Sequence, residues 1–159
     1  MYMNRKGIVF GYKDTFSLDY TLSPVILAAL KKFKEVITEP KHADFVGVPG
    51  VIVVDLFSVD GEYSETTDEQ RDEAVRVWHE IIDKMIYAFN VKNEPKMSDY
   101  NFKINMREVE KFEDGSCRVA IDTENEKEYQ RYRADEEKHN KAVQEGHELF
   151  GKYFSNLWW

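Results

Sequence analysis

Three stretches of the chain place apolar residues three and four positions apart, which is the spacing of one face of an α-helix. They cover residues 17–38, 68–90 and 123–158 approximately. The clearest is the second, with apolar positions at Ala74, Val77, Trp78, Ile81, Ile82, Met85, Ile86 and Phe89. The pattern predicts a core of three helices. The aromatic end of the third, 149–158, needs a large apolar partner, which we expect the first two helices to supply.

The ends of these helices carry local signals. Pro24 lies inside the first pattern and predicts either a bend near Tyr20 or a short first turn before a main helix that begins at Ser23. Asp14 and Ser17 are both candidate N-caps for this helix. The sequence 67–70, Thr-Asp-Glu-Gln, is typical of a capping box and marks the start of the second helix.

Two stretches favour β-structure. Residues 51–59 are rich in β-branched side chains and precede an Asp-Gly pair, which predicts a β insertion near 50–63. Apolar residues alternate on both sides of Asp114-Gly115, which predicts a hairpin near 101–122. The alternation breaks at Val109, where we expect a bulge or a short helix.

Together these elements predict an α+β, mainly α fold in a single domain, 1–159. The 42% of apolar residues suffices for a sizeable core. The one cysteine, Cys117, excludes an internal disulfide, fits a reducing cytoplasm and is expected to be a small core residue. We expect no signal peptide, because no apolar segment follows residues 1–6, and no membrane span.

The formal net charge of −8 argues against non-specific binding to nucleic acid, which requires a basic surface. The charge is compatible with an acidic surface that engages a basic partner. It also has a simpler interpretation, which is that it keeps the protein in solution.

Candidate metal chemistry is limited to Glu136 and His139, a Glu-x-x-His spacing on the third predicted helix. In four-helix di-iron proteins two such motifs and two further glutamates hold the metals. Neither His147 nor His79 has a glutamate at the matching position. We therefore favour a solvated charged face and expect no cofactor.

Aromatic residues gather near both ends of the chain. Either the two ends pack together as core, or some of these side chains form a contact surface for a partner or a base. The contact candidates are Tyr12, Phe16, Tyr20, Trp158 and Trp159, together with Arg131, Arg133 and Lys138 as groups that could hold phosphates.

Three segments carry a family resemblance: FGYKDTFSLDYTL (10–22), WHEIIDKMIYAF (78–89) and GHELFGKYFSNLWW (146–159). They resemble a widespread set of small, largely uncharacterised proteins encoded by tailed bacteriophages. The resemblance covers the three helices, about half the chain. It implies a phage origin and a location in the host bacterial cytoplasm, and it transfers no catalytic residue.

The leading hypothesis is a non-enzymatic phage accessory protein that counteracts host defence. It would either inhibit a host immune protein or sequester a signalling nucleotide. Two alternatives stay open, a metal-dependent hydrolase and a structural or assembly protein of the phage. A homo-oligomer is compatible with each.

Overall fold

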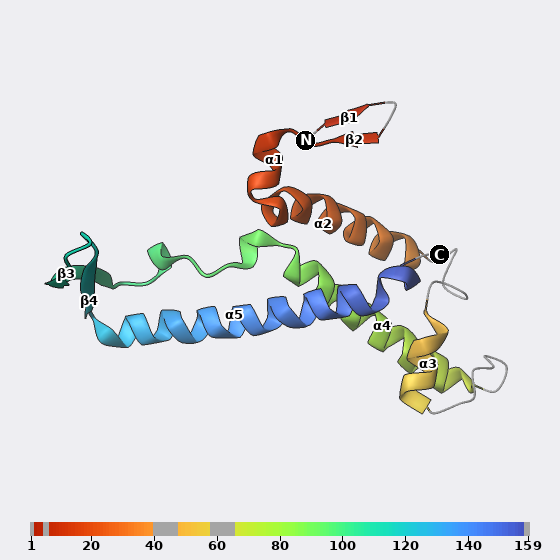
Figure 1. Cartoon of the computed structure of the whole chain (residues 1–159). Helices are drawn as coiled ribbons and strands as arrows, with labels where there is room; N and C mark the ends of the chain where they lie inside the picture. Colours follow the sequence, from red (N-terminus) through yellow and green to blue (C-terminus); the bar gives the residue numbers. More distant parts are fainter. Residues whose placement is uncertain (1, 5–6, 40–47, 58–65, 158–159) are drawn as a thin grey trace. The chain divides into compact units, whose positions relative to one another are not determined.

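The computed structural model describes residues 2–4, 7–39, 48–57 and 66–157 (Figure 1). The elements in chain order are β1 (Tyr2–Asn4), β2 (Gly7–Val9), α1 (Tyr12–Phe16), α2 (Leu18–Ile37), α3 (Gly50–Phe57), α4 (Asp68–Ala88), η3 (Val91–Asn93), η4 (Met97–Asp99), β3 (Lys103–Lys111), β4 (Cys117–Glu124), α5 (Glu126–Tyr153) and η5 (Phe154–Asn156). The α+β, mainly α class is confirmed. Within the described ranges, no helix has both the length and the apolarity to cross a membrane.

The chain divides into two compact units. One contains Met1–Lys92 and Ala142–Trp159, and the other contains Asn93–Lys141. Helix α5 contributes its last part to the first unit and its first part to the second. That the whole chain folds as one domain stays a prediction.

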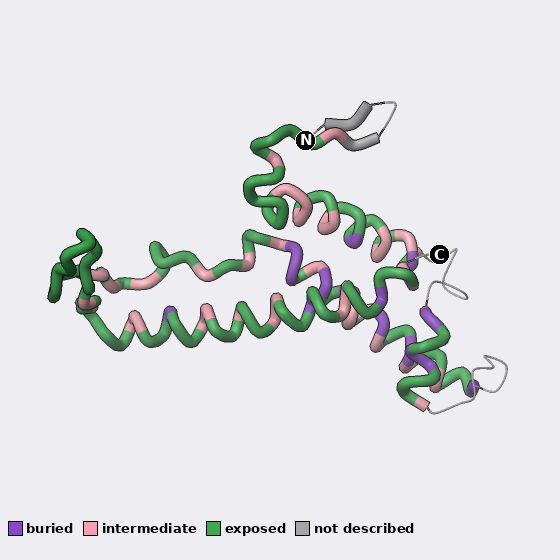
Figure 2. The backbone as a smooth tube through the Cα atoms, viewed as in Figure 1, coloured by how far each residue is buried: buried purple, intermediate pink, exposed green. Residues whose placement is uncertain are grey.

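The core of the first unit is built around Trp78 on α4. Its side chain is fully buried and makes edge-to-face ring contacts with Phe33 of α2 and Tyr153 of α5, at centroid distances of 6.5 and 5.5 Å. More buried positions fall on α4 than on any other described helix (Figure 2). The prediction that the end of the third helix packs against the first two is therefore confirmed. Helix α4 begins as predicted, since Thr67 and Gln70 form a reciprocal capping box.

The predicted β insertion near 50–63 is wrong over its described part, because Gly50–Phe57 forms helix α3. Ile52 and Val53 are both buried, whereas adjacent residues of a strand would point to opposite faces. A helix also satisfies its own backbone hydrogen bonds, so the segment needs no neighbouring strand. The Asp60-Gly61 turn signal lies outside the described residues.

The first predicted helix, near 17–38, is confirmed as α2 (Leu18–Ile37), but the predicted bend near Tyr20 or start at Ser23 is wrong. Ser17 has a non-helical conformation between α1 and α2, with φ −133° and ψ 76°. Pro24 lies inside a continuous α2. Neither predicted N-cap caps α2 through its side chain. Asp14 lies inside α1, where it accepts the Gly11 N–H at 2.7 Å, and the Ser17 side chain makes no cap bond.

In the second unit the predicted hairpin is confirmed, with antiparallel pairing of β3 and β4 and a bulge between Glu108 and Glu110. Gly115 adopts φ +85° in the turn, a conformation that favours glycine. Asp114 accepts hydrogen bonds from the side chain and the backbone N–H of Ser116, which lower the pKa of its carboxyl. Cys117 is exposed on β4, so the prediction of a core cysteine is wrong.

The packed centre of the second unit is aromatic. Four aromatic rings pack there, those of Tyr100, Phe102, Tyr129 and Tyr132. Phe102 contacts the other three, and Tyr100 also contacts Tyr132, with centroid distances of 5.3 to 6.5 Å. Tyr132 is buried, and its hydroxyl donates to Glu136 at 3.0 Å. These contacts hold the segment before β3 against the first turns of α5.

Candidate functional site

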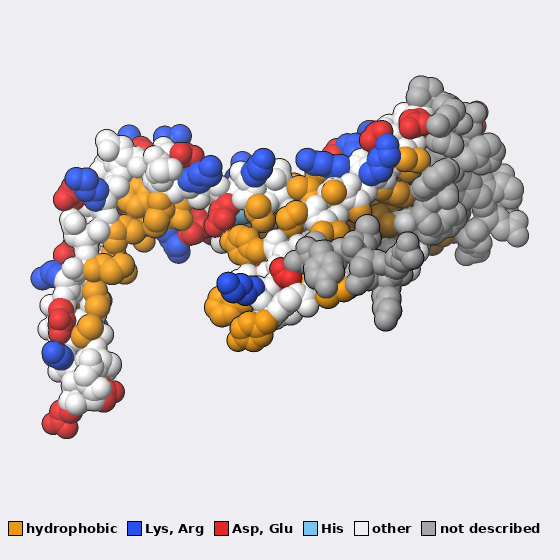
Figure 3. Space-filling view, turned by 90° about the horizontal axis from the view of Figure 1, so that it is seen from above, with side chains coloured by type: hydrophobic (Ala, Val, Ile, Leu, Met, Phe, Trp, Pro, Cys, Tyr) orange, Lys and Arg blue, Asp and Glu red, His pale blue; other side chains and the backbone are white. Residues whose placement is uncertain are grey.

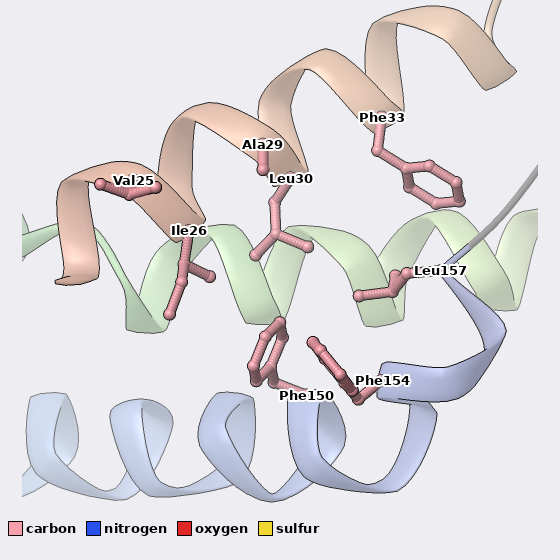
Figure 4. Close-up of a pocket in the computed structure, with 8 residues that line it drawn as sticks. All are labelled: Val25, Ile26, Ala29, Leu30, Phe33, Phe150, Phe154 and Leu157. Atoms are coloured by element: carbon pink, nitrogen blue, oxygen red, sulfur yellow. The ribbon is translucent and has the colours of Figure 1, made fainter. Parts of the chain in front are cut away.

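The most distinctive surface feature of the first unit is an apolar groove of about 340 Å³ between α2 and the C-terminal end of α5 with η5 (Figure 4). All of its lining residues are apolar: Val25, Ile26, Ala29, Leu30, Phe33, Phe150, Phe154 and Leu157. The volume is at the lower end of the range of small ligand pockets.

Two helical patterns create this groove. The five lining residues of α2 repeat at three- and four-residue spacing, so they share one helix face. On the opposite wall Phe150 and Phe154 lie one turn apart, with ring centroids at 5.3 Å. Phe150 is in turn held by Phe89, just after α4, in an edge-to-face contact at 4.9 Å. The wall is therefore anchored to the core.

The floor and the rim of the groove differ in exposure. Leu30 is 2% exposed and belongs to the core, whereas Val25 is 38% and Phe154 is 65% exposed. An exposed phenylalanine ring beside an apolar depression keeps hydrophobic surface in water, which is unfavourable unless a partner covers it. The groove thus presents an accessible hydrophobic surface whose α5 wall is packed against the core.

The predicted N-terminal contact residues lie elsewhere on the first unit. Tyr12, Phe16 and Tyr20 are 89%, 86% and 60% exposed, and none of them lines the groove. The interpretation that the two ends of the chain pack together as core is therefore wrong for these three side chains. Their exposure agrees with the alternative of a contact surface. Trp158 and Trp159 lie outside the described residues.

The predicted phosphate-holding groups are in the second unit. Arg133 forms an ion pair with Glu136. Arg131 lies 3.8 Å from a carboxylate oxygen of Glu128 and over the ring of Tyr100. Both guanidinium groups already have acidic neighbours, so a phosphate would have to compete with carboxylates. Lys138 is exposed on the same helix.

The Glu136 and His139 pair does not form a metal site of the kind known from di-iron proteins. Glu136 accepts a hydrogen bond from Tyr132 on one oxygen and pairs with Arg133 through the other. Across the described part of the chain, no group of three or more His, Cys, Asp or Glu side chains is placed to hold a metal ion.

His79 lies at the edge of the α4 apolar face, as its position beside Trp78 predicts, and is half-buried. Burial, and then the nearby Lys34 ammonium, lower the pKa of His79, while Asp83 acts in the opposite direction. Lys34 and Asp83 form an ion pair between α2 and α4. The histidine therefore shares its surroundings with a charged contact between two core helices.

We expect His79 to make the folded state sensitive to acid. Its pKa is lower in the folded chain than in the unfolded chain, so the unfolded chain binds more protons as the pH falls through about 6.5. The free energy of unfolding should therefore decrease from about pH 7.5 to about pH 5.5, and decrease less in His79→Gln. Urea unfolding at a series of pH values measures this. Equal decreases in the two proteins would contradict the assignment.

Comparison with known proteins adds no relative. No protein-family model matches the chain, and no match is found among curated proteins or solved structures. The bacteriophage resemblance therefore stays a prediction.

The groove residues lie within the first and third predicted helices, 17–38 and 123–158. The apolar patterns predict that the α2 stripe and the aromatic stripe of α5 are buried as partners in one core. The structure leaves part of each stripe accessible, because α4 covers only some of their combined width. The apolar faces of α2 and α5 together are wider than α4 alone can cover. This difference in width is the sequence signal that could have indicated a groove.

Proposed function

We propose that this protein acts by binding, as a bacteriophage accessory protein that inhibits a host defence protein. The observation that carries the binding function is the wholly apolar groove between α2 and the end of α5. The phage origin and the host target rest on the resemblance of the three helical segments.

The chemistry of the groove favours a protein partner. A depression of this size accepts one or two large apolar side chains, such as the Leu or Phe anchors of an amphipathic helix. Phe154 and Val25 on the rim would be covered by the same helix. Anchors of this type supply much of the affinity when they are fully desolvated.

The alternative of nucleotide sequestration receives less support. The groove has no polar side chain among its lining residues to orient a base or a sugar. The arginines predicted to hold phosphates, Arg131 and Arg133, have carboxylate neighbours instead.

A plating experiment tests the proposal. The protein is expressed in bacteria that each carry one defence system, and the plating efficiency of a sensitive phage is measured. We expect at least a tenfold rise on one system. Val25→Glu and Phe154→Asp should abolish the rise, because each places a carboxylate in the groove.

Val75→Glu is the matched control. Val75 is 36% exposed on α4 and Val25 is 38% exposed on α2, so both changes put the same charge on a partly exposed helix position. The control should retain the effect, and thermal unfolding should show that the variants remain folded. A retained rise in the groove variants, or equal loss in all three variants, would contradict the role of the groove.

A further inference from the structure

The β3–β4 hairpin has two unlike faces (Figure 3). One face is mainly apolar and carries Ile104, Met106, Val119 and Ile121, with Thr123 opposite Ile104 and Glu108 opposite Val119. The other is charged and has opposite charges across the strands, with Lys103 facing Glu124, Arg107 paired with Asp122 at 2.9 Å, and Glu110 facing Arg118. The sheet therefore has the pattern of a half-buried structure.

The apolar face is nevertheless in contact with water. Met106 is 71% and Ile121 is 59% exposed. In the described part of the chain the sheet has two strands only, so the outer edge of each has no strand beside it. A two-stranded hairpin is marginally stable by itself, and three or more strands with an apolar face are needed for independent stability. The hairpin is thus poised to accept a further strand.

The two edges differ in their capacity to pair with a copy of themselves. Edge β3 contains the bulge between Glu108 and Glu110, which interrupts a regular ladder. Antiparallel self-pairing of β3 about Arg107 would also place that residue against itself and Lys103 against Lys111. Bulges and charges of this kind protect natural sheet edges from pairing.

Edge β4 has neither obstacle. It is a regular strand of eight residues with the sequence Cys-Arg-Val-Ala-Ile-Asp-Thr-Glu. Antiparallel self-pairing about Ala120 places Arg118 opposite Asp122 of the second copy on the charged face. It also places Val119 opposite Ile121 of the second copy on the apolar face. Opposite charges and apolar pairs are the cross-strand combinations that stabilise antiparallel sheets.

We propose that β4 pairs with β4 of a second copy of this chain across a two-fold axis at Ala120, which gives a four-stranded antiparallel sheet. The apolar faces of the two hairpins then lie on the same side and continue into each other. The outer edges of the new sheet are both β3, whose bulge and charges stop further growth. The assembly is a closed dimer, and it does not depend on the groove.

A double charge exchange tests the pairing without breaking the hairpin. Glu110→Arg with Arg118→Glu keeps the opposite-charge pair inside each hairpin, but places a new carboxylate against Asp122 of the second copy. Lys103→Glu with Glu124→Lys is the control, since this exchange also keeps an internal pair and adds no like-charge contact across the axis. Sedimentation equilibrium should give twice the 18.8 kDa chain mass for the wild type and the control. The first exchange should weaken dimerisation at least tenfold.

Disulfide formation tests the register. In a Cys117→Ser background, Ala120→Cys should form a disulfide-linked dimer under mild oxidation, because the two side chains are neighbours across the axis. Asn105→Cys on β3 should not, although the Asn105 side chain is more exposed than that of Ala120. A monomeric wild type, equal dimerisation of the two charge exchanges, or equal cross-linking of the two cysteine variants would overturn the proposal.

Discussion

Replacing Gly146 by alanine is expected to destabilise the first unit by a net amount of about 1 kcal/mol, although alanine is the better helix former. A Cβ at position 146 would lie 2.4 Å from the Cβ of Ala88 and 2.4 Å from the carbonyl oxygen of Lys84. The second contact is with backbone, so rotation of a side chain cannot relieve it. Overpacking of this kind costs about 1–3 kcal/mol, against a helix-propensity gain of about 0.5–1 kcal/mol.

Gly151→Ala is the control on the same helix. A Cβ at Gly151 meets nothing within 4 Å. This change should therefore raise the free energy of unfolding by up to about 1 kcal/mol through helix propensity alone. Urea unfolding of both variants measures the two effects. The same sign for both would contradict the close approach of α4 and α5 at Gly146.

Trp78→Ala is expected to cost about 3–5 kcal/mol, the range found for truncation of a large buried aromatic side chain. Trp78 is 0% exposed, and its ring joins α4 to both α2 and the end of α5. Its loss removes contacts from three helices at once. Because a loss of about 3–5 kcal/mol is a large fraction of the free energy of unfolding of a typical domain, the Trp78→Ala variant should be largely unfolded at about 37 °C.

Tyr12→Ala provides the comparison, since Tyr12 is 89% exposed. The free energy of unfolding of that variant should lie within about 0.5 kcal/mol of the wild-type value. Thermal unfolding followed by circular dichroism measures both proteins. A Trp78→Ala protein as stable as Tyr12→Ala would show that Trp78 is not the centre of the core.

Two of the elements that the sequence predicted correctly each have two agreeing local signals. Helix α4 has a regular apolar face and the Thr67–Gln70 capping box. The β3–β4 hairpin has alternating side chains and an Asp-Gly turn in which Gly115 takes a positive φ. In both cases propensity and periodicity favour the same structure.

Tertiary contacts decided what the sequence predicted wrongly. Val51–Val54 has the composition of a strand, but packing of Ile52 and Val53 on one side favours helix α3. Phe16 and Phe33 are both aromatic residues in or beside the first predicted helix, yet Phe33 packs against Trp78 and Phe16 is 86% exposed. Periodicity indicates which face of a helix is apolar, but the partner helices determine how much of that face is covered. The groove is the part left accessible.

Site-specific photo-cross-linking tests most directly whether the groove between α2 and α5 binds a host protein. A photoreactive amino acid is placed at Phe154, on the groove rim, and separately at Val75 on α4. The two proteins are irradiated in bacteria that carry the defence system on which the wild type acts. The proposed function predicts one discrete adduct, with a component of that defence system, at position 154 and none at position 75. No adduct at position 154, or the same adducts at both positions, would contradict it.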